Sequence, residues 1–156
     1  MTTADRIGIW HVPVGGQAPE EVPTQWVSAL AAVSQDLQCR RHGRTISFDD
    51  VAWELTVHAD GTVYIGITPY GGGTDLGGFA RGMGYTLDTS AAQAMVWVAD
   101  AIQDELAGYE FVQWPMDGTR ILVPKIQEDD AVWVRPATNE AVCRIGDLCQ
   151  QPTDTA

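Results

Sequence analysis

The sequence predicts an α+β fold in which an antiparallel sheet of about six or seven short strands is packed by two helices. Three observations support this prediction: two segments with helical apolar spacing, two alternating runs joined by Asp60-Gly61, and a C-terminal third of short apolar runs separated by turn pairs. A hydrophobic content of 45% in 156 residues suits one globular domain. We expect that domain over residues 1–150, followed by a flexible tail at 151–156.

The first helix is predicted over residues 24–38, with Thr24 as its N-cap. Four apolar residues recur there at helical spacing and form one stripe: Trp26, Leu30, Val33 and Leu37. The second helix is predicted over residues 91–107, where Ser90 and Gln93 form a capping box and Gly108 suits the position just past the end. Its core stripe comprises Met95, Val98, Ile102 and Leu106.

The strands are predicted around these helices. A strand near residues 6–12 precedes Pro13, which would confine it to a sheet edge or end it. The hairpin over 51–68 turns at Asp60-Gly61, and one of its faces carries the apolar residues Val51, Trp53, Leu55, Val57, Val63, Ile65 and Ile67. Short strands after residue 109 form an antiparallel meander.

A glycine-rich stretch at residues 70–88 separates the hairpin from the second helix. It lacks the spacing and the lysine of a phosphate-binding loop, and Asp75 and Asp88 would repel an anion. Tyr70, Phe79, Met83 and Tyr85 would be costly to expose in a solvated linker. We therefore expect the stretch to fold back over the domain and to provide a contact surface.

The charge balance restricts the class of partner. A net charge of -12 leaves no basic surface for nucleic acid and repels anionic membranes, whereas it speeds encounter with a basic protein. No apolar run is long enough for a membrane helix or a signal peptide, which predicts a cytoplasmic protein. Three cysteines in such a protein suit reduced thiols, with a Cys143–Cys149 bridge as the alternative.

Metal binding and catalysis have few candidate residues. Cys39, His42, Cys143 and Cys149 are ligand types that suit zinc, although a buried free cysteine explains Cys143 equally well. No other cofactor is expected. His58 and Glu54 share one face of the hairpin but lie about 13 Å apart along a strand, too far to act together. A magnesium nuclease site on Asp49, Asp50 and Glu54 conflicts with the charge balance, so we favour a protein without enzymatic activity.

The second helix breaks two local rules of helix electrostatics. Asp100 and Asp104 form a like-charge pair one turn apart, and Asp104 and Glu105 lie in the last turn, at the negative pole of the helix. Trp97 projects on the same side and would serve as an aromatic anchor for a partner. In the alternative interpretation, the loop or a strand buries Trp97 and the acids form an ordinary solvated face.

The sequence thus predicts a non-catalytic acidic protein-binding module, for example an inhibitor or immunity-type protein that neutralises a partner with a basic surface. The predicted partner-binding residues are Trp97, Asp100, Asp104, Glu105, Tyr70, Phe79 and Tyr85. A structural subunit of a phage or another assembly is one alternative function. A small zinc-binding protein or enzyme that uses Cys39, His42, Cys143 and Cys149 is the other.

Overall fold

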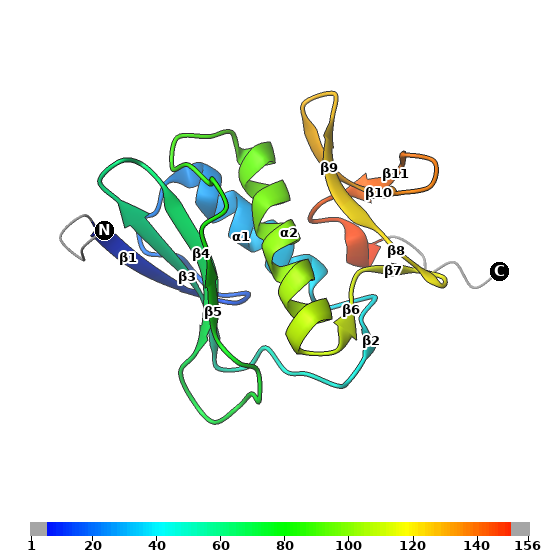
Figure 1. Cartoon of the computed structure of the whole chain (residues 1–156), viewed down its shortest axis with the longest axis horizontal. Coiled ribbons are helices and arrows are strands. Elements are labelled where there is room, and N and C mark those ends of the chain that lie inside the picture. The colour runs from blue at the N-terminus through cyan, green and yellow to red at the C-terminus, as the bar shows by residue number, and fades with distance from the viewer. Residues whose placement is uncertain (1–5, 151–156) are drawn as a thin grey trace.

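The computed structural model describes residues 6–150 and confirms the predicted α+β fold. Its two α-helices, α1 (Thr24–Asp36) and α2 (Ala91–Tyr109), pack against each other and lie between two antiparallel sheets (Figure 1). Neither helix in this part of the chain is long and apolar enough to cross a membrane. The expected tail at 151–156 lies outside the described residues.

The larger sheet contains the predicted hairpin. Its four antiparallel strands follow the order β1 (Arg6–Pro13), β3 (Val51–His58), β4 (Val63–Pro69) and β5 (Phe79–Arg81). All the residues assigned to the apolar face of the hairpin are buried. Strand β1 lies at the edge of the sheet and ends at Pro13, as predicted. Alternation along the sequence therefore identified the inner face of this sheet correctly.

The glycine-rich stretch contributes the other edge of this sheet. Strand β5 comes from its middle and pairs with β4, with Ala80 opposite Gly66. A Cβ at Gly66 would lie 1.9 Å from the carbonyl oxygen of Phe79, so only glycine permits β5 to approach this closely. The stretch is thus joined to the sheet in its middle.

The strands after α2 form a second sheet on the other side of the helices. The three antiparallel strands are β9 (Val123–Gln127), β10 (Asp130–Arg135) and β11 (Glu140–Arg144). Two-residue strands form two smaller pairs: β2 (His42–Gly43) with β6 (Val112–Gln113), and β7 (Met116–Asp117) with β8 (Arg120–Ile121). The described residues thus form eleven strands, more than predicted, and two main sheets where one was expected.

The separation of the sheets follows from the apolar surface of α2. This helix contacts β4 on one side and β9 and β10 on the other. Its fully buried residues include alanines beside the predicted stripe: Ala94, Val98, Ala99, Ala101, Ile102 and Leu106. A helix with such a wide apolar surface packs between two layers, whereas the sequence prediction had assigned it one buried stripe.

The helix ends differ partly from the predictions. Ser90 caps α2 as expected, because its hydroxyl accepts a hydrogen bond from the Gln93 main-chain N–H at 3.0 Å. Thr24 is the first helical residue of α1, which has no side-chain cap at Pro23. Gly108 lies inside α2, and Phe111 takes the left-handed conformation instead, with φ 58°. The helix therefore continues past the glycine that was expected to end it.

The last turn of α1 is the polar centre of the core. Asp36 is fully buried, and its carboxylate accepts hydrogen bonds from Trp133 Nε1 at 2.8 Å, Gly146 N at 2.7 Å and Leu148 N at 3.1 Å. Trp114 Nε1 donates to the Asp36 carbonyl at 3.0 Å, and Trp53 Nε1 to the Ser34 hydroxyl at 2.8 Å. These bonds connect α1 to both sheets and to the C-terminal segment.

A disulfide joins Cys39, just after α1, to Cys149 in the 3-10 helix η2 (Leu148–Gln150). This pairing corrects both cysteine expectations, namely reduced thiols and a Cys143–Cys149 bridge. Cys143 is the free cysteine and is half-buried against the core. The pairing spans 110 residues of sequence, so local spacing gave no indication of it.

Candidate functional site

The C-terminal half of α2 carries the three carboxylates predicted to bind a partner. Asp100 and Asp104 are exposed, and Glu105 is half-buried. The last turn of the helix contains no basic residue. Arg81 of β5 supplies a counter-charge, because its Nη1 lies 3.1 Å from Asp104 Oδ2 and 3.5 Å from the Ala101 carbonyl oxygen. The acidic surface, defined here as Asp100, Asp104 and Glu105, therefore faces the edge strand β5.

A groove runs between the end of α2 and β5. It has a volume of about 490 Å³. Strand β5 and the residue before it line one side, and α2 lines the other, with these residues: Gly78, Phe79, Ala80, Arg81, Asp104, Glu105 and Tyr109. The groove thus combines two aromatic rings, two carboxylates and the main chain of an edge strand.

The carboxylates of the acidic surface are held in an unfavourable environment. Asp100 is exposed but partly desolvated, which raises its pKa; the neighbouring Asp104 raises this pKa further, and Arg81 opposes the shift. Burial also raises the pKa of Glu105, together with repulsion from Glu110, and again Arg81 opposes it. A cation that binds here would relieve this repulsion and lower both pKa values.

Trp97, on the same helix as the acidic surface, packs against two other aromatic rings. Trp97 is half-buried, with its ring centroid 6.3 Å from that of Trp26 and 5.5 Å from that of Tyr85. Tyr85 is only 4% exposed. The glycine-rich stretch therefore packs against Trp97 through Tyr85, which favours the alternative interpretation of this residue.

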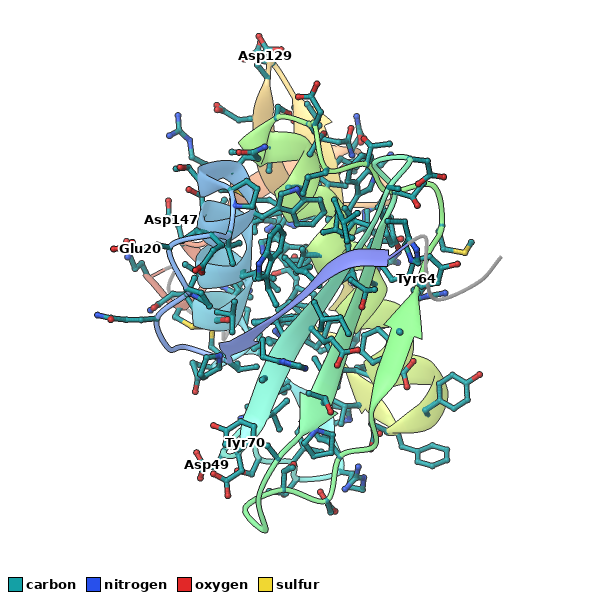
Figure 2. The ribbon with its side chains drawn as sticks, turned by 90° about the vertical axis from the view of Figure 1, so that its left-hand side faces the viewer. Glu20, Asp49, Tyr64, Tyr70, Asp129 and Asp147 are labelled. Carbon is teal, nitrogen blue, oxygen red and sulfur yellow. A yellow bond between two sulfur atoms is a disulfide. The ribbon has the colours of Figure 1, made fainter. Side chains whose placement is uncertain are left out.

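Tyr70 lies on a different surface from the other predicted site residues. It is 61% exposed at the outer face of the four-stranded sheet, where it lines a groove of about 440 Å³ with His11, Pro13, Ala52, Thr68 and Pro69. No helix covers this face, and Tyr64 and Tyr70 lie at separate points on it (Figure 2). Ile7, Ile9 and Tyr64 are also exposed there. The structure thus separates the predicted residues into two groups.

Two exposed aromatic residues beside the acidic surface were missed by the sequence analysis. Tyr109 is 74% exposed and Phe111 is 75% exposed. A large side chain in the left-handed conformation, as at Phe111, is uncommon. The segment was interpreted as a strand because Gly108 was expected to end the helix, and no other signal in the sequence indicated exposure.

Glu110 holds these two aromatic residues in place. It is 7% exposed, forms an ion pair with Arg44, and accepts a hydrogen bond from the Gly77 N–H at 3.1 Å. Arg44 Nε also donates to the Glu110 carbonyl oxygen at 3.1 Å. One buried carboxylate therefore fixes the end of α2, the segment before β3 and the glycine-rich stretch.

Further hydrogen bonds hold the glycine-rich stretch on the domain. The Gly73 N–H donates to Asp50 Oδ2 at 3.0 Å, and the Thr74 hydroxyl donates to the Ser47 carbonyl at 2.6 Å. The Asp50 carboxylate thus takes part in loop structure, as does Asp75 through its ion pair with Arg44. The stretch is ordered beside the groove.

The structure does not bring the four proposed zinc ligands together. Cys39 and Cys149 form the disulfide, so neither sulfur is a thiolate ligand in this state. Burial raises the pKa of the Cys143 thiol to about 11. Within residues 6–150, no group of three or more histidine, cysteine, aspartate or glutamate side chains is placed to hold a metal ion.

The histidines do not form the acid–base pair that was considered on the hairpin. Glu54 pairs with His11 of β1, whose Nε2 lies 2.9 Å from Glu54 Oε1. His58 contacts the Tyr64 ring, with centroids 5.1 Å apart. His58 and Glu54 therefore have separate partners, as their spacing along the strand had suggested.

Comparisons with known proteins give no match: no family model, no curated protein and no solved structure is similar to this chain. Any proposal about function therefore rests on the geometry and charge of the surfaces described above. Of these, the acidic surface and its groove combine exposed carboxylates, aromatic rings and an edge strand.

Proposed function

We propose that the protein is a non-catalytic binding module, of the inhibitor or immunity type, that neutralises a protein partner with a basic surface. The observation that carries the proposal is the acidic surface at the negative pole of α2, where Asp100 and Asp104 remain exposed and the last turn contains no basic residue. Arg81 pairs with Asp104, but neither Asp100 nor Glu105 has an ion pair among the described residues. A basic partner would supply the missing counter-charge.

The energetic argument concerns what a partner would change. Carboxylates at a helix C-terminus and like charges one turn apart each cost a few tenths of a kcal/mol or more. A partner that brings lysine or arginine side chains to Asp100, Asp104 and Glu105 would turn this cost into attraction. The net charge of -12 would also speed the encounter.

Exposed aromatic rings supply the apolar part of such an interface. Tyr109 and Phe111 are more exposed than any other aromatic side chain in the described part of the chain, and both lie at the end of the acidic helix. Aromatic residues are enriched at the energetic centres of interfaces. They would contribute binding energy that salt does not screen.

A capture experiment tests the proposal. Immobilised wild-type protein is incubated with lysate of the native host at low and high salt, captured proteins are identified, and the affinity of each is then measured in purified form. We expect a basic protein whose association rate falls about tenfold or more with the Asp100→Lys/Asp104→Lys variant and steeply with salt.

The matched control is Glu20→Lys/Glu21→Lys, which makes the same charge change at two exposed residues in the loop before α1. It should retain most of the association rate. Binding that is insensitive to salt, or that weakens equally in both variants, would contradict a specific role for α2.

A second candidate function is an assembly subunit, for example of a phage particle. The uncovered outer face of the four-stranded sheet supports it, because Ile7 and Tyr70 are 66% and 61% exposed on that face and its edge. Large apolar side chains that are exposed on an uncovered sheet face could be covered by a second copy of the chain. Light scattering across a range of concentrations tests this candidate, and a strictly monomeric protein would remove self-assembly through this face.

A further inference from the structure

We propose that the groove between β5 and α2 binds an extended segment of the basic partner, which adds to the free edge of β5 as a further strand. The segment places a lysine or arginine side chain against Asp104 and Glu105. This inference rests on the proposed function and specifies which part of the partner binds, where it binds and in what conformation.

The edge of β5 is open to an additional strand. It is the last strand in the order β1-β3-β4-β5, so one of its long sides has no strand neighbour. Such an edge presents main-chain N–H and C=O groups that can pair with an extended peptide. The groove runs along this strand and the residue before it, which gives room for a short segment beside β5.

The opposite wall of the groove selects a cation. Asp104, Glu105 and Tyr109 of α2 line it, and the Phe79 ring lies on the strand side. Carboxylates recognise the charge of a lysine or arginine, and an aromatic face attracts the same cation. A segment with one basic side chain directed at α2 therefore matches the walls of this groove.

Two observations on the contacts in the groove support this occupant. Arg81 already places a guanidinium nitrogen 3.1 Å from Asp104 Oδ2, so the structure shows that this group fits against the wall. Glu105 is half-buried, yet it has no ion pair among the described residues. A partly desolvated carboxylate that has no ion pair is a favourable partner for a cation delivered from outside.

The other edge of the sheet is less suited to this role. Strand β1 carries a register irregularity between Arg6 and Gly8 and ends at Pro13, and both features hinder pairing with an added strand. Helix α1 supplies no wall of exposed carboxylates, because Asp36 is its one acidic residue and is fully buried. The groove at β5 is therefore the site for strand addition.

The test uses a defined peptide, Ac-GTRTRTG-NH2, with the full-length protein. Calorimetry measures its affinity, and amide hydrogen exchange followed by NMR reports on β5. We expect binding to slow exchange of those amides within residues 79–81 that point away from β4, because alternate N–H groups of a strand face opposite edges. Two peptides that are N-methylated at alternate residues cover both pairing registers, and at least one should bind about tenfold more weakly because it loses main-chain hydrogen bonds.

Isosteric variants that remove the negative charge test where the basic side chains of the peptide bind. Asp104→Asn/Glu105→Gln should weaken the peptide about tenfold, whereas Glu20→Gln/Glu21→Gln, with the same change of charge, should leave its affinity unchanged. The isosteric substitutions preserve side-chain size, and circular dichroism verifies the fold. The peptide Ac-GTETETG-NH2 should not bind, and equal binding of both peptides would overturn the inference.

The outcomes separate this inference from the proposed function. Peptide binding that is unaffected by N-methylation in either register would overturn strand addition while leaving electrostatic recognition intact. If the peptide fails to bind but a basic protein binds α2 in a salt-dependent manner, the inference about the groove is overturned and the proposed function stands. Loss of both would remove the inference and the proposed function together.

Discussion

The two helices use their carboxylates in opposite ways. In α1, Asp36 is fully buried and its two oxygens accept three hydrogen bonds from the second sheet and the C-terminal segment. In α2, Asp100 and Asp104 are exposed, and Arg81 is the cation that pairs with Asp104. The comparison teaches that the fold uses the carboxylate of α1 as a hydrogen-bond acceptor, whereas the carboxylates of α2 remain accessible to a partner.

The pKa shifts sharpen this contrast. Burial is the main cause of the raised pKa at both Asp36 and Asp100. At Asp36, hydrogen bonds from Trp133, Gly146 and Leu148 oppose the shift, so the core offsets part of the cost of burying the charge. At Asp100, the neighbouring Asp104 adds to the shift. A carboxylate stabilised by its own fold and one repelled by its neighbour should respond differently to substitution.

The largest effect is expected at the disulfide that holds the end of α1. Cys39→Ser/Cys149→Ser should lower the free energy of unfolding by about 4 kcal/mol, because the bridge closes a long loop in the unfolded chain. Urea unfolding measures this. Cys143→Ser is the control and should have a smaller effect. Equal unfolding midpoints for the double variant and the oxidised wild type would contradict the expected stabilisation.

The next effect is expected at Asp36. Asp36→Ala leaves three buried donors without an acceptor and should destabilise the protein by about 3 kcal/mol. Asp36→Asn should destabilise the protein less than Asp36→Ala, because the amide oxygen can still accept hydrogen bonds. It should remain less stable than wild type, because all three partners of the carboxylate are N–H groups and the new NH2 group would face one of them. Unfolding in urea at neutral pH ranks the variants, and an Asn variant as stable as wild type would refute the network's role.

The pH dependence of this effect has a definite sign. Because the folded-state pKa of Asp36 is raised, its ionisation costs stability as pH rises from the ordinary aspartate value through the folded-state pKa. The stability advantage of wild type over Asp36→Asn should therefore be largest at acidic pH and smaller at neutral pH.

The smallest effect on stability is expected at the acidic surface. Asp100→Asn should leave stability unchanged or raise it by a few tenths of a kcal/mol at neutral pH, because it removes repulsion from Asp104. Since the pKa of Asp100 is raised, the wild-type side chain takes up a proton as pH falls. The gain in stability of Asp100→Asn over wild type should then disappear. Thermal unfolding at neutral and mildly acidic pH tests this, and a clear loss at neutral pH would show that the fold uses the charge.

Local patterns predicted much of the fold. The hairpin follows from alternation and Asp60-Gly61, and the buried stripe of α1 follows from the spacing of Trp26, Leu30 and Val33. The disulfide and the second sheet were missed because they depend on contacts between residues far apart in sequence. Strand β5 was missed because three residues among glycines carry no periodic signal.

The site was predictable to the extent that helix geometry determines it. The exposure of Asp100 and Asp104 follows from their position on α2 opposite its buried stripe. The groove could not be predicted, because it forms only where β5 lies beside α2, and no local pattern in the sequence indicates that position. Burial of Trp97 likewise depends on the path that places Tyr85 over it.

The tryptophan hydrogen bonds described above have an optical consequence. Trp26, Trp53, Trp114 and Trp133 are each at most 1% exposed, and three of their four indole N–H groups donate to residues 34–36 of α1. The indole emission of the native protein should therefore lie at short wavelength and be dominated by rings gathered around one helix end. A red shift on perturbation would then report loosening of that end of α1, so the chain carries an intrinsic fluorescent probe of its own core.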